Sequence, residues 1–158
     1  MVEVIEKLKK FFDENDTHYS KGISEEEAAV LSSRCMDELG FEIPIEYVEF
    51  LKKMNGFDYD GRRMFGFVTD ELKNTNREIS DFFKWNNEYG GMDSSREGGW
   101  LGQDYIFMGE GSCHTYIAMD MRTRKIVKLG TVCFEEEGEY TSFEEMLDGF
   151  FLGVFEER

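Results

Sequence analysis

The segment IPIEYVEFLKKMNG, residues 43–56, carries the clearest structural signal in the chain. Its apolar side chains recur at the spacing of one helical face, i, i+3, i+4 and i+7: Tyr47, Phe50, Leu51 and Met54. Pro44 suits the first turn of a helix, where its missing N–H is not needed, and Asn55-Gly56 is typical of a helix end. The segment therefore predicts a helix that begins at Pro44, ends at Asn55-Gly56 and buries one face.

Helical apolar spacing also predicts helices on both sides of this segment, over residues 4–12, 24–39, 79–89 and 143–154. Ser24 and Glu27 have the spacing of a capping box, in which each residue satisfies a free N–H of the other. Gly40 follows the last apolar position of that helix and predicts its end. Thr141 and Ser142 are candidate caps for the last helix.

Short runs of β-branched and aromatic residues predict strands over residues 62–68, 104–108, 115–121, 125–129 and 132–134. Gly109-Glu110-Gly111 separates two of these strands, and Arg122-Thr123-Arg124 suits a tight hairpin. The acidic run Glu135–Glu139 predicts a loop before the last helix. Because helices and strands are segregated along the chain, we expect an α+β fold. Its sheet should be mainly antiparallel and packed with helices, in a single domain over residues 1–158.

Composition and charge exclude several classes of protein. The chain holds 34 Asp and Glu against 18 Lys and Arg, a formal net charge of −16. This surplus weighs against binding to nucleic acid or to anionic lipid. With 41% hydrophobic and 15% aromatic residues, the chain can bury a core. Its three cysteines, with no signal-peptide pattern and no apolar run of membrane-spanning length, favour the cytoplasm.

Three short motifs resemble reactive or ligand-binding sites, and each has a simpler interpretation. Adjacent residues on a strand point to opposite faces, so Cys113-His114 does not chelate one ion. Asp58-x-Asp60-Gly61 lacks the later ligands of a calcium loop and predicts a turn. Gly109-x-Gly111 has no third glycine and precedes a strand, unlike a dinucleotide-binding loop. The sequence therefore predicts no catalytic residue, no metal site and no cofactor.

Three blocks of sequence together resemble the SUKH superfamily, which includes the yeast cell-wall-synthesis regulators and many bacterial immunity proteins. The first is the helix at 43–56 with Ile23-Ser24-x-x-Glu27 and Leu39-Gly40 before it. The second, Tyr105-Ile106-x-x-Gly109-x-Gly111 with Tyr116-Ile117-x-x-Asp120, is similar to the family's central hairpin. The third, Ser142-Phe143-x-x-Met146-Leu147, is similar to its C-terminal helix. The resemblance spans about residues 22–152 and leaves the helix at 2–14 as an extension. Ser112-Cys113-His114 departs from the Gly-Asp that the family often has.

The resemblance implies a cytoplasmic protein-binding domain and not an enzyme. Its bacterial members are similar to antitoxins that neutralise toxin domains delivered between cells. We therefore expect an immunity protein that binds a cognate toxin, for which a nuclease with a basic cleft is one candidate. The alternatives are a regulatory adaptor or scaffold without a toxin partner, and a small hydrolase or ligand-binding enzyme, for which the sequence offers no convergent polar set.

The candidate partner-binding residues are acidic, apart from one tryptophan: Asp58, Asp60, Trp100, Glu110, Asp120, Glu135, Glu136 and Glu137. The excess negative charge motivates the acidic set, because it can steer a basic partner toward the protein. The alternative is an ordinary solvated surface. Trp100 lies in a Gly-rich, charged loop, where it is either a core residue or an apolar anchor for the partner.

Overall fold

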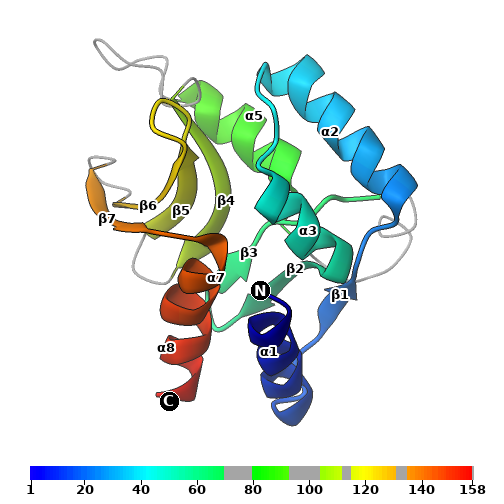
Figure 1. The fold of residues 1–158 in the computed structure, drawn as a ribbon, viewed down its shortest axis with the longest axis vertical. Coiled ribbons are helices and arrows are strands. Elements are labelled where there is room, and N and C mark those ends of the chain that lie inside the picture. Colours follow the sequence, from blue (N-terminus) through cyan, green and yellow to red (C-terminus); the bar gives the residue numbers. More distant parts are fainter. Residues whose placement is uncertain (70–79, 93–103, 112–114, 131–134, 158) are drawn as a thin grey trace.

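The computed structural model describes residues 1–69, 80–92, 104–111, 115–130 and 135–157, with the backbone alone for 88–92. These residues form one seven-stranded sheet in which each strand pairs antiparallel with the next along the chain (Figure 1). The strands are β1 (Tyr19–Lys21), β2 (Met54–Tyr59), β3 (Arg62–Met64), β4 (Tyr105–Gly111), β5 (Thr115–Asp120), β6 (Lys125–Gly130) and β7 (Glu136–Tyr140). The helices are α1 (Val2–Glu14), α2 (Glu25–Leu39), α3 (Ile45–Lys53), α5 (Phe82–Met92), α7 (Phe143–Met146), the π-helix η2 (Leu147–Leu152) and α8 (Gly153–Glu156). The predicted α+β fold with an antiparallel sheet is confirmed.

The helices lie in two groups at opposite ends of the molecule. Figure 1 shows α2 and α5 side by side at one end, and α1 beside the continuous C-terminal helix of α7, η2 and α8 at the other. Helix α3 lies between the two groups. Buried side chains occur along nearly the whole of β4 and β5 and at three positions of β6. Because successive side chains point to opposite faces of a strand, both faces of β4 and β5 are covered.

The capping signals read from the sequence are present. The backbone N–H of Glu27 donates to Ser24 Oγ, and the backbone N–H of Ser24 donates to Glu27 Oε1 at 2.9 Å. Gly40 ends α2 in the left-handed region at φ 74°. Ser142 caps the last helix by accepting from the backbone N–H of Glu145.

The predicted end of the third helix is wrong. Helix α3 ends at Lys53, and Met54 opens β2, so that Asn55 and Gly56 lie in a strand. The Asn55 side chain donates to the carbonyl of Phe67 and accepts from its N–H, at 2.8 and 2.7 Å, which ties β2 to the segment after β3. A Cβ on Gly56 would lie 2.8 Å from the carbonyl oxygen of Met64, so this glycine allows the close strand approach.

Two predicted strand boundaries also change. The strand predicted over residues 62–68 is short, since β3 ends at Met64. Gly109-Glu110-Gly111 does not separate two strands, because β4 continues to Gly111. A Cβ on Gly109 would lie 2.7 Å from the carbonyl oxygen of Arg63, so the glycine permits contact between β4 and β3. The hairpin between β5 and β6 is confirmed, and Arg124 in its turn has φ 60°.

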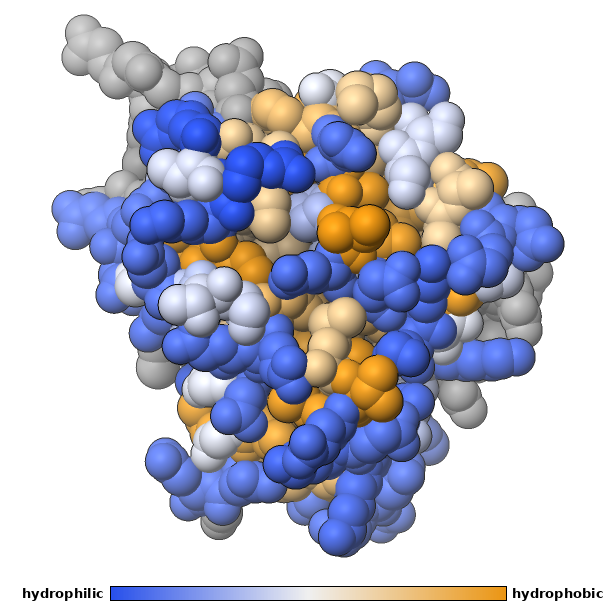
Figure 2. Space-filling view, viewed as in Figure 1, coloured by the Kyte–Doolittle hydropathy of each residue, from blue (hydrophilic) through white to orange (hydrophobic). Residues whose placement is uncertain are grey.

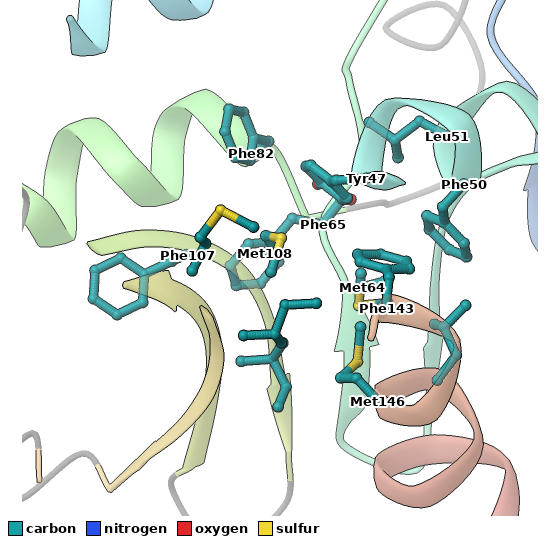
Figure 3. Close-up of a cluster of buried hydrophobic side chains, with 14 of the residues drawn as sticks. Tyr47, Phe50, Leu51, Met64, Phe65, Phe82, Phe107, Met108, Phe143 and Met146 are labelled. Atoms are coloured by element: carbon teal, nitrogen blue, oxygen red, sulfur yellow. The ribbon is translucent and has the colours of Figure 1, made fainter. Parts of the chain in front are cut away.

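The core forms where the α3 stripe meets the sheet and the C-terminal helix (Figure 3). Tyr47, Phe50, Leu51 and Met54 are all 0% exposed, which confirms the predicted buried face. The ring of Phe50 lies 5.7 Å from that of Phe143. The hydroxyl of Tyr47 donates to the carbonyl oxygen of Phe65, so this buried polar group is satisfied.

Candidate protein-binding surface

The acidic run Glu135–Glu139 lies mostly on the edge strand β7. The loop predicted here is wrong, because residues 136–140 pair with β6 in an antiparallel register, from Ile126 opposite Tyr140 to Leu129 opposite Glu136. Residues 135–139 are all exposed. Glutamate and glycine have low strand preference, so the pairing with the apolar strand β6 determines the conformation of this segment. The strand predicted at 132–134 lies outside the described residues.

Two lysines of β6 partly balance the carboxylates of β7. The Nζ of Lys125 lies 3.1 Å from Glu139 Oε2, and the Nζ of Lys128 lies 3.8 Å from Glu137 Oε2. The side chains of Glu139 and Glu137 remain 58% and 46% exposed in these pairs. Exposed ion pairs of this kind contribute about 0–1 kcal/mol, so a partner can replace them at little cost.

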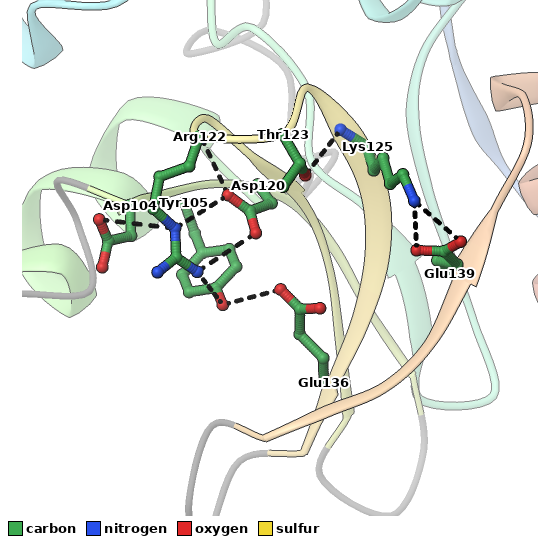
Figure 4. A network of polar contacts seen from close by, with 8 residues as sticks. All are labelled: Asp104, Tyr105, Asp120, Arg122, Thr123, Lys125, Glu136 and Glu139. Carbon is green, nitrogen blue, oxygen red and sulfur yellow. Dashed lines mark hydrogen bonds and ion pairs between the residues drawn. The ribbon is translucent and has the colours of Figure 1, made fainter.

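A polar network joins β7 to the hairpin between β5 and β6 (Figure 4). The Tyr105 hydroxyl donates to Glu136 Oε1 at 3.1 Å and accepts from Arg122 Nη2 at 3.3 Å. Arg122 also donates to both oxygens of Asp120, through Nε and Nη2 at 3.2 Å and through its backbone N–H at 2.9 Å. Asp104 lies at the margin of the network, 4.0 Å from the Arg122 guanidinium.

The pKa directions in this network follow from burial and from these hydrogen bonds. Burial, followed by the hydrogen bond to Glu136, raises the pKa of Tyr105 to about 12. Burial opposes ionisation of Asp120, but the hydrogen bonds from Arg122 and its positive charge outweigh burial, so the pKa of Asp120 is lowered. Asp120 is 2% exposed. Its carboxylate therefore fixes the hairpin and does not present a contact surface.

Two of the other predicted residues, Asp58 on β2 and Glu110 on β4, flank Arg63 on β3. Asp58 lies opposite Arg63, and Arg63 lies opposite Glu110. The Arg63 Nε lies 3.8 Å from Asp58 Oδ2 and 3.4 Å from Glu110 Oε2. Asp60 occupies the β2–β3 turn with φ 51°, beside Gly61, so the predicted turn is confirmed. Asp58 and Glu110 are balanced by an arginine and belong to other strands than the β7 carboxylates.

The described residues thus divide the predicted acidic set into Asp58 and Glu110 beside Arg63, Asp60 in the β2–β3 turn, the buried Asp120 and the exposed carboxylates of residues 135–137. Trp100 lies outside the described residues, as do Cys113, His114 and Cys133. Among the residues whose placement is described, no three His, Cys, Asp or Glu side chains converge on a metal position. The same part of the chain holds no helix that is both long and apolar enough to cross a bilayer.

A groove of about 320 Å³ lies between the β7 end of the sheet and the N-terminal end of α3. Met119, Ile126 and Tyr140 form its apolar lining, and Glu46, Arg124 and Ser142 also border it. Figure 2 shows apolar residues at several places on the face seen in Figure 1, with hydrophilic side chains between and around them. The sequence does not indicate this groove, because its lining comes from strands and a helix that are distant in the chain.

The SMI1/KNR4 family (SUKH-1) model matches residues 22–151 of the chain, which contain every element from α2 to β7. The chain belongs to the SMI1/KNR4 family. No curated protein sequence matches the chain.

The family segment contains all of the predicted partner-binding residues. Helix α1, strand β1 and helix α8 lie outside it. The acidic charge continues past β7, because residues 135–157 hold nine acidic residues and no Lys or Arg: Glu135, Glu136, Glu137, Glu139, Glu144, Glu145, Asp148, Glu156 and Glu157. Residues 135–157, which extend past the family segment, therefore carry negative charge alone.

Proposed function

We propose that this SMI1/KNR4 protein is a cytoplasmic protein-binding domain and acts as an immunity protein. It binds a cognate toxin domain with a basic surface and blocks that surface. The observation that carries this proposal is the acidic sheet edge at residues 135–139. Glu135 precedes β7, and Glu136, Glu137 and Glu139 lie on it, all of them exposed in a segment without Lys or Arg. Membership of the family is consistent with this role.

The physical basis is electrostatic complementarity. Nuclease toxins hold phosphates with Lys and Arg, so the surface to be blocked is positive. An acidic strand on a rigid sheet attracts such a surface over a distance and raises the association rate, while wrong partners with acidic surfaces are repelled. The β7 carboxylates are held only in exposed pairs or by one hydroxyl, so they are available for contact.

A binding role, and not a catalytic one, is also favoured by the titratable groups. The groups of the described region with shifted pKa values are either engaged in local hydrogen bonds and ion pairs, as in Asp120 and Glu145, or buried, as in Cys35 and Tyr47. A catalytic site needs such groups to converge on a pocket that admits substrate. We therefore propose that the protein is not an enzyme.

The test is neutralisation of toxicity. A toxin domain found encoded next to this gene is expressed in a bacterial host, alone and together with this protein. We expect growth arrest in the first case, and growth with a co-purifying complex in the second. A core variant, Leu51→Asp, is the control and should not restore growth. Growth arrest that persists with the folded protein present would contradict the immunity role, and a stable complex with a non-toxic partner would favour the adaptor.

A further inference from the structure

The edge of the sheet at β7 offers backbone groups as well as charge. β7 is the last strand in the sheet order and pairs with β6 on one side. Among the described strands, none pairs with its other side. An edge strand directs alternate N–H and C=O groups away from the sheet, where an added strand can bond to them.

The two faces of β7 differ in chemistry. Residues directly opposite in an antiparallel pair share a face. Tyr140 lies opposite Ile126, and Ile126 lies opposite Met119, so these three form the apolar lining of the groove. Glu139 lies opposite Val127 and Glu136 lies opposite Leu129, across a register shift between Lys128 and Leu129. Because of this shift, both carboxylates lie on the other face although they are three residues apart.

We propose that β7 receives an extended segment of the protein partner as an added strand, in which basic and apolar residues alternate. The inference rests on the proposed function and describes how its partner is held. Basic side chains of the added strand lie over Glu136 and Glu139, and its alternate apolar side chains lie over the groove. Since β7 has five residues, a segment of comparable length is sufficient.

A second copy of this chain is not the occupant. Two β7 strands would place their carboxylates opposite one another, and like charges directly opposite on neighbouring strands are destabilising. The same carboxylates discourage uncharged or acidic strands, which is how edge strands commonly avoid aggregation. A basic strand is attracted where an acidic strand is repelled. Its Lys or Arg side chains can form ion pairs with Glu139 across the new interface, in place of the exposed pair between Lys125 and Glu139.

The experiment uses the whole protein and three synthetic peptides of equal charge. The first alternates Lys and Val, the second has the same residues in separate Lys and Val blocks, and the third is the alternating peptide with alternate backbone nitrogens methylated. Affinity is measured by fluorescence anisotropy at about 0.1 M salt, where long-range attraction is screened beyond about 10 Å. Amide hydrogen exchange reports which strand becomes protected.

We expect the alternating peptide to bind about tenfold more tightly than either control peptide, because several ladder hydrogen bonds and the matched faces are lost in the controls. Exchange should slow in β7. The variant Glu136→Gln/Glu139→Gln should bind the alternating peptide at least about fivefold less tightly. The matched control is Glu3→Gln/Glu14→Gln, whose carboxylates are 80% and 62% exposed and pair with Lys7 and Lys10 on α1, and its affinity should not change.

Equal affinity for all three peptides would overturn the inference, because attraction by charge alone would then explain binding. If the α1 and β7 variants lost the same amount of affinity for the alternating peptide, the inference would be overturned as well. So would sedimentation showing a dimer of the protein that the β7 variant abolishes, since the edge would then hold a second copy. If the protein neutralises the toxin in cells but does not bind the alternating peptide, the proposed function stands and this inference fails.

Discussion

The ring of Phe11 on α1 is stacked on the ring of Phe155 on α8, with centroids 5.3 Å apart and an interplanar angle of 15°. Phe12 lies 5.9 Å from the same ring. Both helices lie outside the family segment 22–151, one before it and one after it. The two segments outside the family match therefore pack against each other, and each one buries apolar side chains of the other.

Removal of the Phe155 side chain tests this relationship. Phe155 is 2% exposed, so Phe155→Ala should lower the free energy of unfolding by about 3–5 kcal/mol in urea denaturation. The control is Ile45→Ala, at a side chain that is 75% exposed, which should change stability by no more than about 0.5 kcal/mol. If Phe155→Ala and Ile45→Ala unfolded at the same urea concentration, α8 would contribute nothing to the stability of the core.

The central stripe of α3 gives a second prediction. Leu51 is 0% exposed and lies in the main core. Leu51→Ala removes buried methyl groups and leaves a cavity, so we expect a loss of about 2–5 kcal/mol, measured by the same denaturation. A loss below about 1 kcal/mol would mean that the helix is not packed as described.

The Asp120–Arg122 pair predicts a pH dependence with a definite sign. Because the folded pKa of Asp120 is lowered relative to the unfolded chain, its contribution to stability is present above about pH 4 and is lost as the pH falls through the folded pKa. Asp120→Asn should cost about 1–3 kcal/mol at neutral pH and little at strongly acidic pH. The free energy of unfolding of the natural protein minus that of Asp120→Asn, measured at each pH, separates the effect of Asp120 from that of the other carboxylates. A cost that is the same at every pH would exclude the linkage.

The thiol of Cys35 should be inert in the folded protein. Cys35 is 0% exposed, and burial, followed by the charge of Glu38, raises its pKa to about 11. In the variant Cys113→Ser/Cys133→Ser, a disulfide reagent should label the remaining thiol only as fast as the protein unfolds. Urea should accelerate labelling in parallel with the loss of structure. Immediate labelling without denaturant would show that α2 does not bury this residue.

Local signals explain which parts of the fold the sequence predicts. The Ser24–Glu27 capping box and the apolar stripe of α3 depend on neighbours within one helix, and both are found. Met54 continues the helical spacing of α3, although it starts β2, because pairing with β1 and β3 overrides the local pattern. The acidic segment of β7 has no strand signal of its own and takes its conformation from β6.

The candidate site was harder to predict for the same reason. The sequence indicates which residues are acidic, but burial decides which of them are available, and Asp120 and Glu136 differ in this respect despite one shared network. The groove that Tyr140 helps to line combines residues from α3, β5, β6 and β7, whose proximity depends on the whole sheet. Only the tertiary structure brings these residues into one surface.

The most direct test of the central claim is the association rate with the cognate toxin as a function of salt. We expect the rate constant for association to fall steeply as salt rises, while the dissociation rate changes much less. The triple variant Glu135→Gln/Glu136→Gln/Glu137→Gln should associate more slowly at low salt and respond less to salt, with its fold intact. The control Glu3→Gln/Glu6→Gln/Glu14→Gln removes the same charge from α1 and should behave like the natural protein. An association rate that is indifferent to salt, with no difference between the two triple variants, would contradict the claim that the acidic edge strand binds the partner.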